Sequence, residues 1–76
     1  MNALNACILV KVIPPQSEAV LKALRGIRDV KKAYFAYGRF DIVAFVEARD
    51  YQGVKAVVDR INSLPHIRST ETLIEA

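Results

Sequence analysis

Short runs of β-branched and aromatic residues alternate along the chain with longer segments that have helical spacing. The first run, residues 6–13, is apolar except for Lys11, which is typical of an interior strand with two covered faces. Pro14 and Pro15 end this strand, because proline cannot donate a hydrogen bond to a sheet ladder. The chain therefore begins with a strand that we expect at the middle of a sheet.

Two segments have the apolar spacing of an amphipathic helix. The first covers residues 17–25, where we expect Ser17 to cap the start and Gly26 to end the helix in a left-handed conformation. The second follows Asp50, which is placed to cap it, and closes before Leu64-Pro65. The apolar stripes of the two helices are Val20, Leu21, Leu24 and Ile27, and Val54, Val57, Val58 and Ile61.

Two further strands, residues 30–37 and 40–48, flank Gly38-Arg39. A glycine that can adopt a positive φ at such a short connection predicts a tight β-hairpin. The last strand, residues 67–74, alternates in polarity, with Thr70 and Thr72 on one face.

The order of elements is therefore βαββαβ, and the two halves repeat at an offset of thirty-seven residues. Leu24 corresponds to Ile61, Val20 to Val57 and Ile8 to Phe45. Two interleaved β-α-β units predict an α+β, ferredoxin-like fold, a four-stranded antiparallel sheet with both helices on one face. Residues 1–76 make one domain, which we expect to stand alone.

The sheet is expected to be apolar on both faces, although the helices can cover only one. The uncovered set on the third strand is either Phe40, Ile42 and Val46 or Val43 and Phe45. On the first strand it is either Ile8, Val10 and Val12 or Cys7, Leu9 and Ile13. An exposed apolar patch of this size usually marks an interface. We therefore expect a symmetric homodimer with its sheets packed face to face.

Composition narrows the class of protein. The formal charge is +3, and the eleven basic residues are interleaved with eight acidic ones, which argues against specific nucleic-acid binding. No apolar run is long enough for a membrane span, and the start has no basic signal-peptide region, so we expect a cytoplasmic protein without membrane contact. The single Cys7 is expected to be a small apolar packing residue.

Few residues offer chemistry. His66 has no cysteine or carboxylate at ligand spacing, and the three glycines are isolated, so neither a metal nor a cofactor is expected. Asp41 has two equally supported interpretations: it accepts hydrogen bonds from nearby turn amides, or it joins the amides near Gly38 in a site for a zwitterion. Thr70 and Thr72 are either ordinary strand formers or polar groups of the same site.

Two stretches resemble motifs of a known family. Residues 37–48, Tyr-Gly-Arg-Phe-Asp-Ile-Val-Ala-Phe-Val-Glu-Ala, resemble the Gly-x-x-Asp hairpin of the leucine-responsive regulator/AsnC family. Residues 64–72, Leu-Pro-His-Ile-Arg-Ser-Thr-Glu-Thr, resemble the Leu-Pro-Gly-Val-x-x-Thr-x-Thr ending of its effector-binding domain, also called the regulation-of-amino-acid-metabolism domain. The resemblance covers nearly the whole chain, and His66 stands where the family usually has glycine.

The resemblance implies a ferredoxin-like domain that dimerises through its sheets and often assembles into octamers. It also implies an amino-acid effector bound between dimers. Gly38, Arg39, Phe40 and Asp41 would form one wall of that site, and Thr70 and Thr72 the other. Because the first strand begins close to Met1, without the helix-turn-helix domain of family transcription factors, we expect no direct sequence-specific DNA binding and a DNA-binding family member as a possible partner.

Three functional classes follow, the third of which is an interaction module that binds no ligand. The leading hypothesis is a non-catalytic amino-acid sensor whose assembly responds to its ligand. The rival is a small dimeric α/β-barrel enzyme with the same topology, such as a monooxygenase. That rival needs polar groups in a cavity between helices and sheet, where the sequence places only apolar positions.

Overall fold

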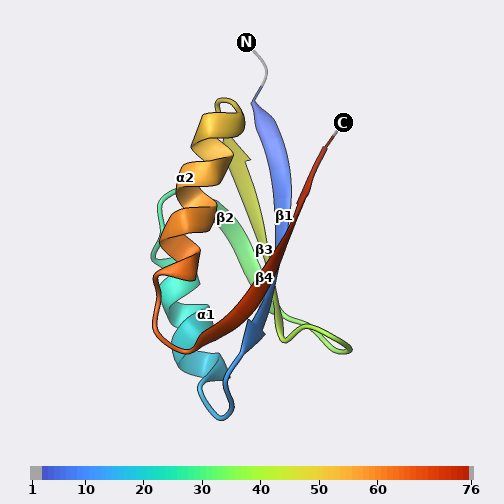
Figure 1. The fold of residues 1–76 in the computed structure, drawn as a ribbon, viewed down its shortest axis with the longest axis vertical. Helices are drawn as coiled ribbons and strands as arrows, with labels where there is room; N and C mark the ends of the chain where they lie inside the picture. Colours follow the sequence, from blue (N-terminus) through green and yellow to red (C-terminus); the bar gives the residue numbers. More distant parts are fainter. Residues whose placement is uncertain (1–2, 76) are drawn as a thin grey trace.

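The computed structural model describes residues 3–75. Its elements are β1 (Leu4–Val12), α1 (Ser17–Arg25), β2 (Val30–Phe35), β3 (Ile42–Ala48), α2 (Tyr51–Asn62) and β4 (Ile67–Ile74). The four strands form one antiparallel sheet in the order β2-β3-β1-β4, and both helices lie against the same face of it (Figure 1). This is the predicted ferredoxin-like α+β fold. Neither helix is long and apolar enough to cross a membrane.

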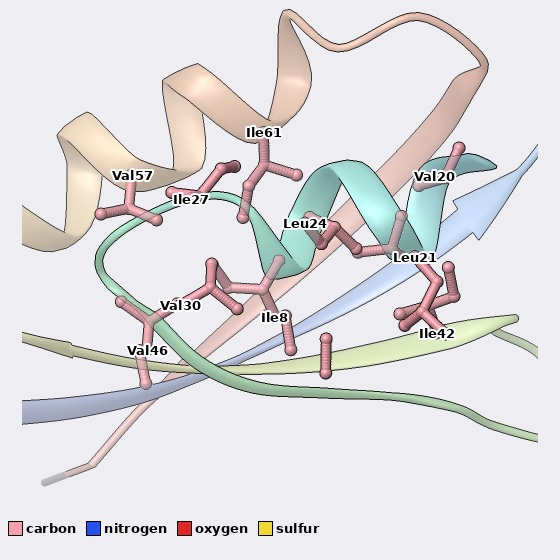
Figure 2. Close-up of a cluster of buried hydrophobic side chains, with 14 of the residues drawn as sticks. Ile8, Val20, Leu21, Leu24, Ile27, Val30, Ile42, Val46, Val57 and Ile61 are labelled. Atoms are coloured by element: carbon pink, nitrogen blue, oxygen red, sulfur yellow. The ribbon is translucent and has the colours of Figure 1, made fainter. Parts of the chain in front are cut away.

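The helices cover the face of the sheet that carries the smaller, regularly alternating aliphatic residues. Leu24 of α1 and Ile61 of α2 are fully buried above Ile8 of β1 (Figure 2). Because strand residues alternate between faces, burial of Ile8 on β1 and Ile42 on β3 fixes which set each strand turns inward. The full core is Ala6, Ile8, Val10, Val12, Val20, Leu21, Leu24, Ile27, Val30, Ala33, Ile42, Ala44, Val46, Val54, Val57 and Ile61.

The other face of the sheet, which we call the open face, has no helix over it. Phe45 and Tyr34 are exposed there with their rings in an edge-to-face pair, 6.3 Å between centroids. Leu9 and Val43, paired on the two central strands, are only half covered. The sequence allowed two apolar sets on each strand for the uncovered face. The structure shows that the uncovered residues are Val43 and Phe45 on β3, and Cys7 and Leu9 on β1.

The ends of the helices are partly as predicted. Asp50 caps α2, since its Oδ1 accepts a hydrogen bond from the Gly53 N–H at 2.9 Å. The other two expectations are wrong: Ser17 is the first helical residue and Gln16 precedes it without a side-chain cap, while Gly26 is right-handed, with φ −83°. The Gly26 N–H still donates to carbonyls of the last turn of α1, so the helix ends without a left-handed residue.

The predicted two-residue hairpin is also wrong, because β2 ends at Phe35 and β3 begins at Ile42. Residues 36–41 form a longer connection, which we call the hairpin loop. It is closed at its base by the Ala36 N–H, which donates to the Asp41 carbonyl at 2.8 Å. Gly38 does have a positive φ, 112°, as expected. The loop extends past the end of the sheet and away from the helices (Figure 1).

Candidate functional site

The hairpin loop is held against the end of β1 by three hydrogen bonds. Asp41 makes two of them: its N–H donates to the Val10 carbonyl at 2.9 Å, and its Oδ2 accepts from the Val12 N–H at 2.8 Å. Lys11, between those two residues, makes the third, since its Nζ donates to the Arg39 carbonyl at 2.8 Å. The Asp41 carboxylate therefore bonds to an amide of β1, not to the turn amides that the local pattern suggested.

The tip of this loop carries donors without partners. The N–H groups of Gly38, Arg39 and Phe40 make no hydrogen bond to any residue of the range 3–75. The Lys11 ammonium is bonded to the Arg39 carbonyl in the same segment. The second oxygen of Asp41, Oδ1, makes no hydrogen bond to a described residue. Several N–H donors, a cation and a carboxylate oxygen therefore gather at one exposed loop, a combination that complements a zwitterion.

The predicted threonine pair lies on the edge strand β4, with both side chains on the face covered by the helices. Thr70 is opposite Val10 of β1 and donates its hydroxyl to the Asn62 Oδ1 at 3.0 Å, at the end of α2. Thr72 is opposite Ile8, and its hydroxyl has no hydrogen-bond partner within residues 3–75. Of the two, Thr72 has the hydroxyl that remains free for a ligand.

Thr72 opens into a groove of about 370 Å³ between α2 and β4. Val54 and Val58 of α2 contribute apolar lining, and Tyr51 lies at the start of the same helix. Lys55 and Asp59 also line the groove and form an exposed ion pair, 3.2 Å between Nζ and Oδ2. An exposed i,i+4 pair of this kind is worth only about 0.3–0.5 kcal/mol, so a ligand with its own charges can replace it.

Within one chain, the hairpin loop and the groove at Thr72 do not lie close together. Asp41 bonds to Val12, whereas Thr72 is opposite Ile8, four residues along the same strand, which corresponds to roughly 13 Å at about 3.3 Å per residue. The hairpin loop also extends past the sheet, while Thr72 faces the helices. A single site containing all the predicted residues therefore requires two copies of the chain.

Comparison with known proteins identifies the family of this chain. The family model described as the Lrp/AsnC ligand binding domain matches residues 5–75. The chain belongs to the Lrp/AsnC family. It is thus a regulatory ligand-binding domain, and the resemblance in the hairpin and threonine segments is confirmed. No curated protein matches it in sequence.

Solved structures of similar fold are matched either over nearly their whole length or over about half of it. TTHA0845 from Thermus thermophilus is 28% identical, with a TM-score of 0.92, and the alignment covers 96% of this chain and 92% of that one. AsnC of E. coli is 26% identical, with a TM-score of 0.87, and the alignment covers 95% of this chain but 50% of AsnC. The regulator NMB0573 of Neisseria meningitidis, solved with L-Met, shares the fold at 17% identity and a TM-score of 0.84, over 96% of this chain and 49% of its own.

Lys11 and the lining of the α2–β4 groove are the parts of this Lrp/AsnC domain that sequence reasoning missed. Lys11 is the only charged residue in an otherwise apolar strand, and that exception was the available signal. Tyr51, Lys55 and Asp59 gave no signal, because their spacing is that of any solvated helix face.

His66, at the position where the family usually has glycine, is left-handed in the structure, with φ 72°. Its carbonyl accepts a hydrogen bond from the Ile13 N–H at 2.9 Å, so this conformation is tied to the end of β1. A left-handed conformation costs an L-residue roughly 1–2 kcal/mol, a cost that glycine avoids. His66 therefore strains the turn that leads into the threonine strand.

His66→Gly is expected to raise the free energy of unfolding by roughly 0.5–1 kcal/mol, less than the full strain because glycine also gains freedom in the unfolded chain. Urea denaturation at one fixed protein concentration measures the change. His66→Ala removes the same imidazole and keeps the strain, so it should show no such gain. A glycine variant no more stable than the alanine variant would contradict the strain.

Cys7 lies on the open face and is half-buried. Burial raises the pKa of its thiol, which favours the protonated form of the sulfur. Within residues 3–75, no group of three His, Cys, Asp or Glu side chains is placed to hold a metal ion.

Proposed function

We propose that this Lrp/AsnC domain is a non-catalytic sensor of a free amino acid, and that it works as a homo-oligomer. The observation that carries the proposal is the hairpin loop, which has three N–H groups without a partner in residues 3–75, the Arg39 carbonyl bonded by Lys11, and the Asp41 carboxylate. Each of these groups matches one part of a zwitterionic ligand.

The ligand's carboxylate would accept hydrogen bonds from the N–H groups of Gly38, Arg39 and Phe40. Lys11 adds positive charge beneath them, and hydrogen bonds to a charged acceptor are about twice as strong as neutral ones. The ligand's ammonium group would donate to Asp41, whose Oδ1 remains available while Oδ2 holds the Val12 N–H. A carboxylate keeps this capacity because its two oxygens together accept about four bonds.

A second copy would complete the site. The walls lie too far apart within one chain, so the hairpin loop of one dimer would face the groove containing Thr72, with Thr70 beside it, on a neighbouring dimer. Contacts of this kind between different surfaces form rings when the rotation closes, and the tetramer of dimers that the resemblance implies would be such a ring. The L-Met complex of NMB0573 supports the ligand class, because it is an amino acid held by a protein of this fold.

The dimer within this assembly would form through the open face. Tyr34, Phe45 and Leu73 are 46%, 42% and 51% exposed there, and exposed apolar patches of this kind usually mark an interface. A chain of this length buries only about 60% of its unfolded surface by itself, so the added burial also increases stability.

The core supports a sensor over an enzyme. Every buried residue of the range 3–75 is apolar, so the core between the helices and the sheet has no buried polar side chain, and the partly exposed Thr70 and Thr72 lie at its edge. A reaction centre in that space would need polar groups to bind and orient a substrate.

The regulated partner we propose is a DNA-binding member of the same family. AsnC is matched over only half its length, so such a protein carries this fold together with further sequence. The present chain would join its oligomer, and would not itself select a DNA sequence. Native mass spectrometry of a mixture of the two proteins tests whether mixed oligomers form.

A thermal-shift screen against the twenty amino acids tests the sensor function. A ligand that binds only the folded protein at about one hundred times its Kd adds about 2.7 kcal/mol of stability, which raises Tm by several degrees. At least one amino acid is expected to do so at millimolar concentration. If none changes Tm, and isothermal calorimetry also detects no binding, the domain is not an amino-acid sensor.

Thr72→Val is expected to weaken binding of that amino acid by about tenfold, because it removes a hydroxyl hydrogen bond of about 1–1.5 kcal/mol and keeps the side-chain volume. Isothermal calorimetry measures the Kd. Ser69→Ala is the matched control, since Ser69 lies on the same strand but faces away from Thr72. Equal affinity in both variants would place the second wall of the site elsewhere.

A further inference from the structure

The mixing of basic and acidic residues that holds along most of the chain stops between residues 22 and 32. This stretch, which we call the basic segment, has five basic residues and one acid, a net charge of +4. The rest of the chain has six basic residues and seven acids, a net charge of −1. The excess positive charge of the protein therefore comes entirely from one segment, whose bases are Lys22, Arg25, Arg28, Lys31 and Lys32.

The fold keeps these charges together where the end of α1 meets the edge strand β2. Lys22 and Arg25 are three residues apart in the last turn of α1, so their side chains are neighbours on the helix surface. The Arg25 guanidinium reaches across to β2, where its Nε and Nη2 donate to the Ala33 carbonyl at 3.1 and 2.8 Å. Lys31 lines the same hollow of about 270 Å³ as Arg25, and Arg28 lies in the loop between α1 and β2.

The cations of the basic segment are available to a partner. All five are exposed, and none is in an ion pair, since the only ion pair within residues 3–75 lies on α2. Arg25 has five N–H donors and uses two of them on Ala33, so three remain. Lys22 and Arg25 belong to a helix on the side of the sheet opposite the open face, so the proposed dimer leaves them uncovered.

The internal repeat shows that the fold does not require this charge. At the offset of thirty-seven residues the basic segment corresponds to residues 59–69, which also contain the end of a helix, a loop and the start of an edge strand. That stretch has two basic residues and one acid, a net charge of +1. Cations complement the dipole at a helix end, and lysines protect an edge strand, but these needs are the same in both halves. Three of the four net positive charges therefore have no structural reason.

We propose that the basic segment binds the phosphate backbone of duplex DNA without reading its sequence. Interfaces between proteins have an apolar and aromatic centre, whereas interfaces with DNA are polar and strongly positive. The aliphatic residues that line the hollow, Val30 and Ala33, are buried. Single strands bind by stacking on free aromatic rings, but the one aromatic residue at the hollow, Tyr34, is already in an edge-to-face pair with Phe45.

The charge density of a duplex suits this cluster. DNA has one negative charge per roughly 1.7 Å of its axis, so Lys22, Arg25, Arg28 and Lys31 can each meet a phosphate oxygen. The guanidinium groups can bond two such oxygens at once. The rest of the chain is net negative and repels DNA, which restricts the approach of a duplex to this side. The contact does not depend on the amino-acid site, and it adds DNA affinity to any oligomer that the chain joins.

Fluorescence anisotropy with a labelled duplex, titrated without amino acid at several salt concentrations, measures the contact. The slope of log K against log salt is expected to be about −3, which weakens binding roughly sixty-fold between 50 and 200 mM salt. Unrelated duplex sequences should bind alike. No binding at the lowest salt concentration, or a clear preference among sequences, would contradict the proposal.

Lys22→Gln combined with Arg28→Gln should make the slope shallower by about two and weaken binding at low salt by about tenfold or more. Arg25 is left unchanged because it ties α1 to β2. Arg49→Gln combined with Arg60→Gln is the matched control: it also removes two positive charges, and Arg60 lies in the last turn of α2 as Lys22 does in that of α1. The control should keep the wild-type slope, with affinity within a few-fold.

Equal losses in the two double variants would show that net charge alone attracts DNA, which would refute a local site. Labelled poly-glutamate with the same number of charges tests the alternative of an acidic protein partner. Its charges are spaced by up to about 3.5 Å, twice the spacing in DNA, so it is expected to bind at least tenfold more weakly than the duplex. Equal affinity would reassign the basic segment to acidic polypeptides. A thermal-shift screen without a hit would refute the amino-acid sensor and leave the DNA contact intact, because these titrations contain no amino acid.

Discussion

Phe45→Glu is expected to separate the two chains of the proposed open-face dimer at micromolar concentration. Phe45 lies near the middle of the open face on the central strand β3, next to Tyr34 and Cys7. In the proposed dimer its side chain is covered by the partner, so a carboxylate there would lose its water. Burying an unpaired charge costs several kcal/mol, and symmetry introduces this cost twice.

The fold itself should tolerate this change, because Phe45 is 42% exposed in the single chain and belongs to none of the core positions. Phe35→Glu is the matched control. Phe35 is an aromatic residue of the neighbouring strand with similar exposure, 49%, but alternation turns it toward the other face. Light scattering and circular dichroism should show a folded dimer for Phe35→Glu and a folded monomer for Phe45→Glu. A dimeric Phe45→Glu protein would show that the open face is not the interface.

The strength of the periodic signal explains why the elements were predictable and some of their details were not. Helix α1 has the predicted bounds because Val20, Leu21 and Leu24 repeat on one stripe without interruption. The thirty-seven-residue offset also holds for the helices, where Leu24 and Ile61 are both buried. It fails for the strands: Ile8 is buried while Phe45 is exposed, since a slip of one residue in a strand moves a side chain to the opposite face.

The hairpin was mispredicted because its closure depends on contacts far apart in sequence. Aromatic residues continue to Tyr37 and resume at Phe40, so the local pattern extends both strands to the glycine. In the structure Asp41 instead bonds to Val10 and Val12, about thirty positions earlier, and these bonds end the ladder at the base of the loop. Local propensity contains no information about such a partner.

The same limit applies to the candidate site. Alternation correctly placed Thr70 and Thr72 on one face of an edge strand. It could not show that Thr70 is engaged with Asn62 or that Thr72 opens into a groove beneath α2, because both depend on how the helix packs. Whether Asp41 acts on the ligand or only on the fold is the question that the sequence left open, and the Val12 bond now makes it testable.

Asp41→Asn and Asp41→Ala separate these two roles. Asparagine keeps a carbonyl oxygen that can accept the Val12 N–H, so the structural bond survives while the negative charge is lost. Alanine loses both the charge and the accepting oxygen. It leaves the partly buried Val12 N–H unpaired, which lowers stability by about 1–3 kcal/mol. Urea denaturation should therefore find Asn close to wild type and Ala clearly less stable.

Binding of the amino acid should follow a different order. Losing a charged partner for the ligand's ammonium group costs on the order of 1.5–3 kcal/mol, which is more than tenfold in Kd. Asp41→Asn is thus expected to bind more than tenfold more weakly by isothermal calorimetry while its stability and oligomeric state are retained. Asp41→Glu keeps the charge but displaces it by one methylene, so its affinity should lie between those of the wild type and Asp41→Asn. If Asn binds as tightly as wild type and only Ala is impaired, Asp41 acts solely by fastening the hairpin loop to β1, and the ammonium group must find its partner on the neighbouring chain.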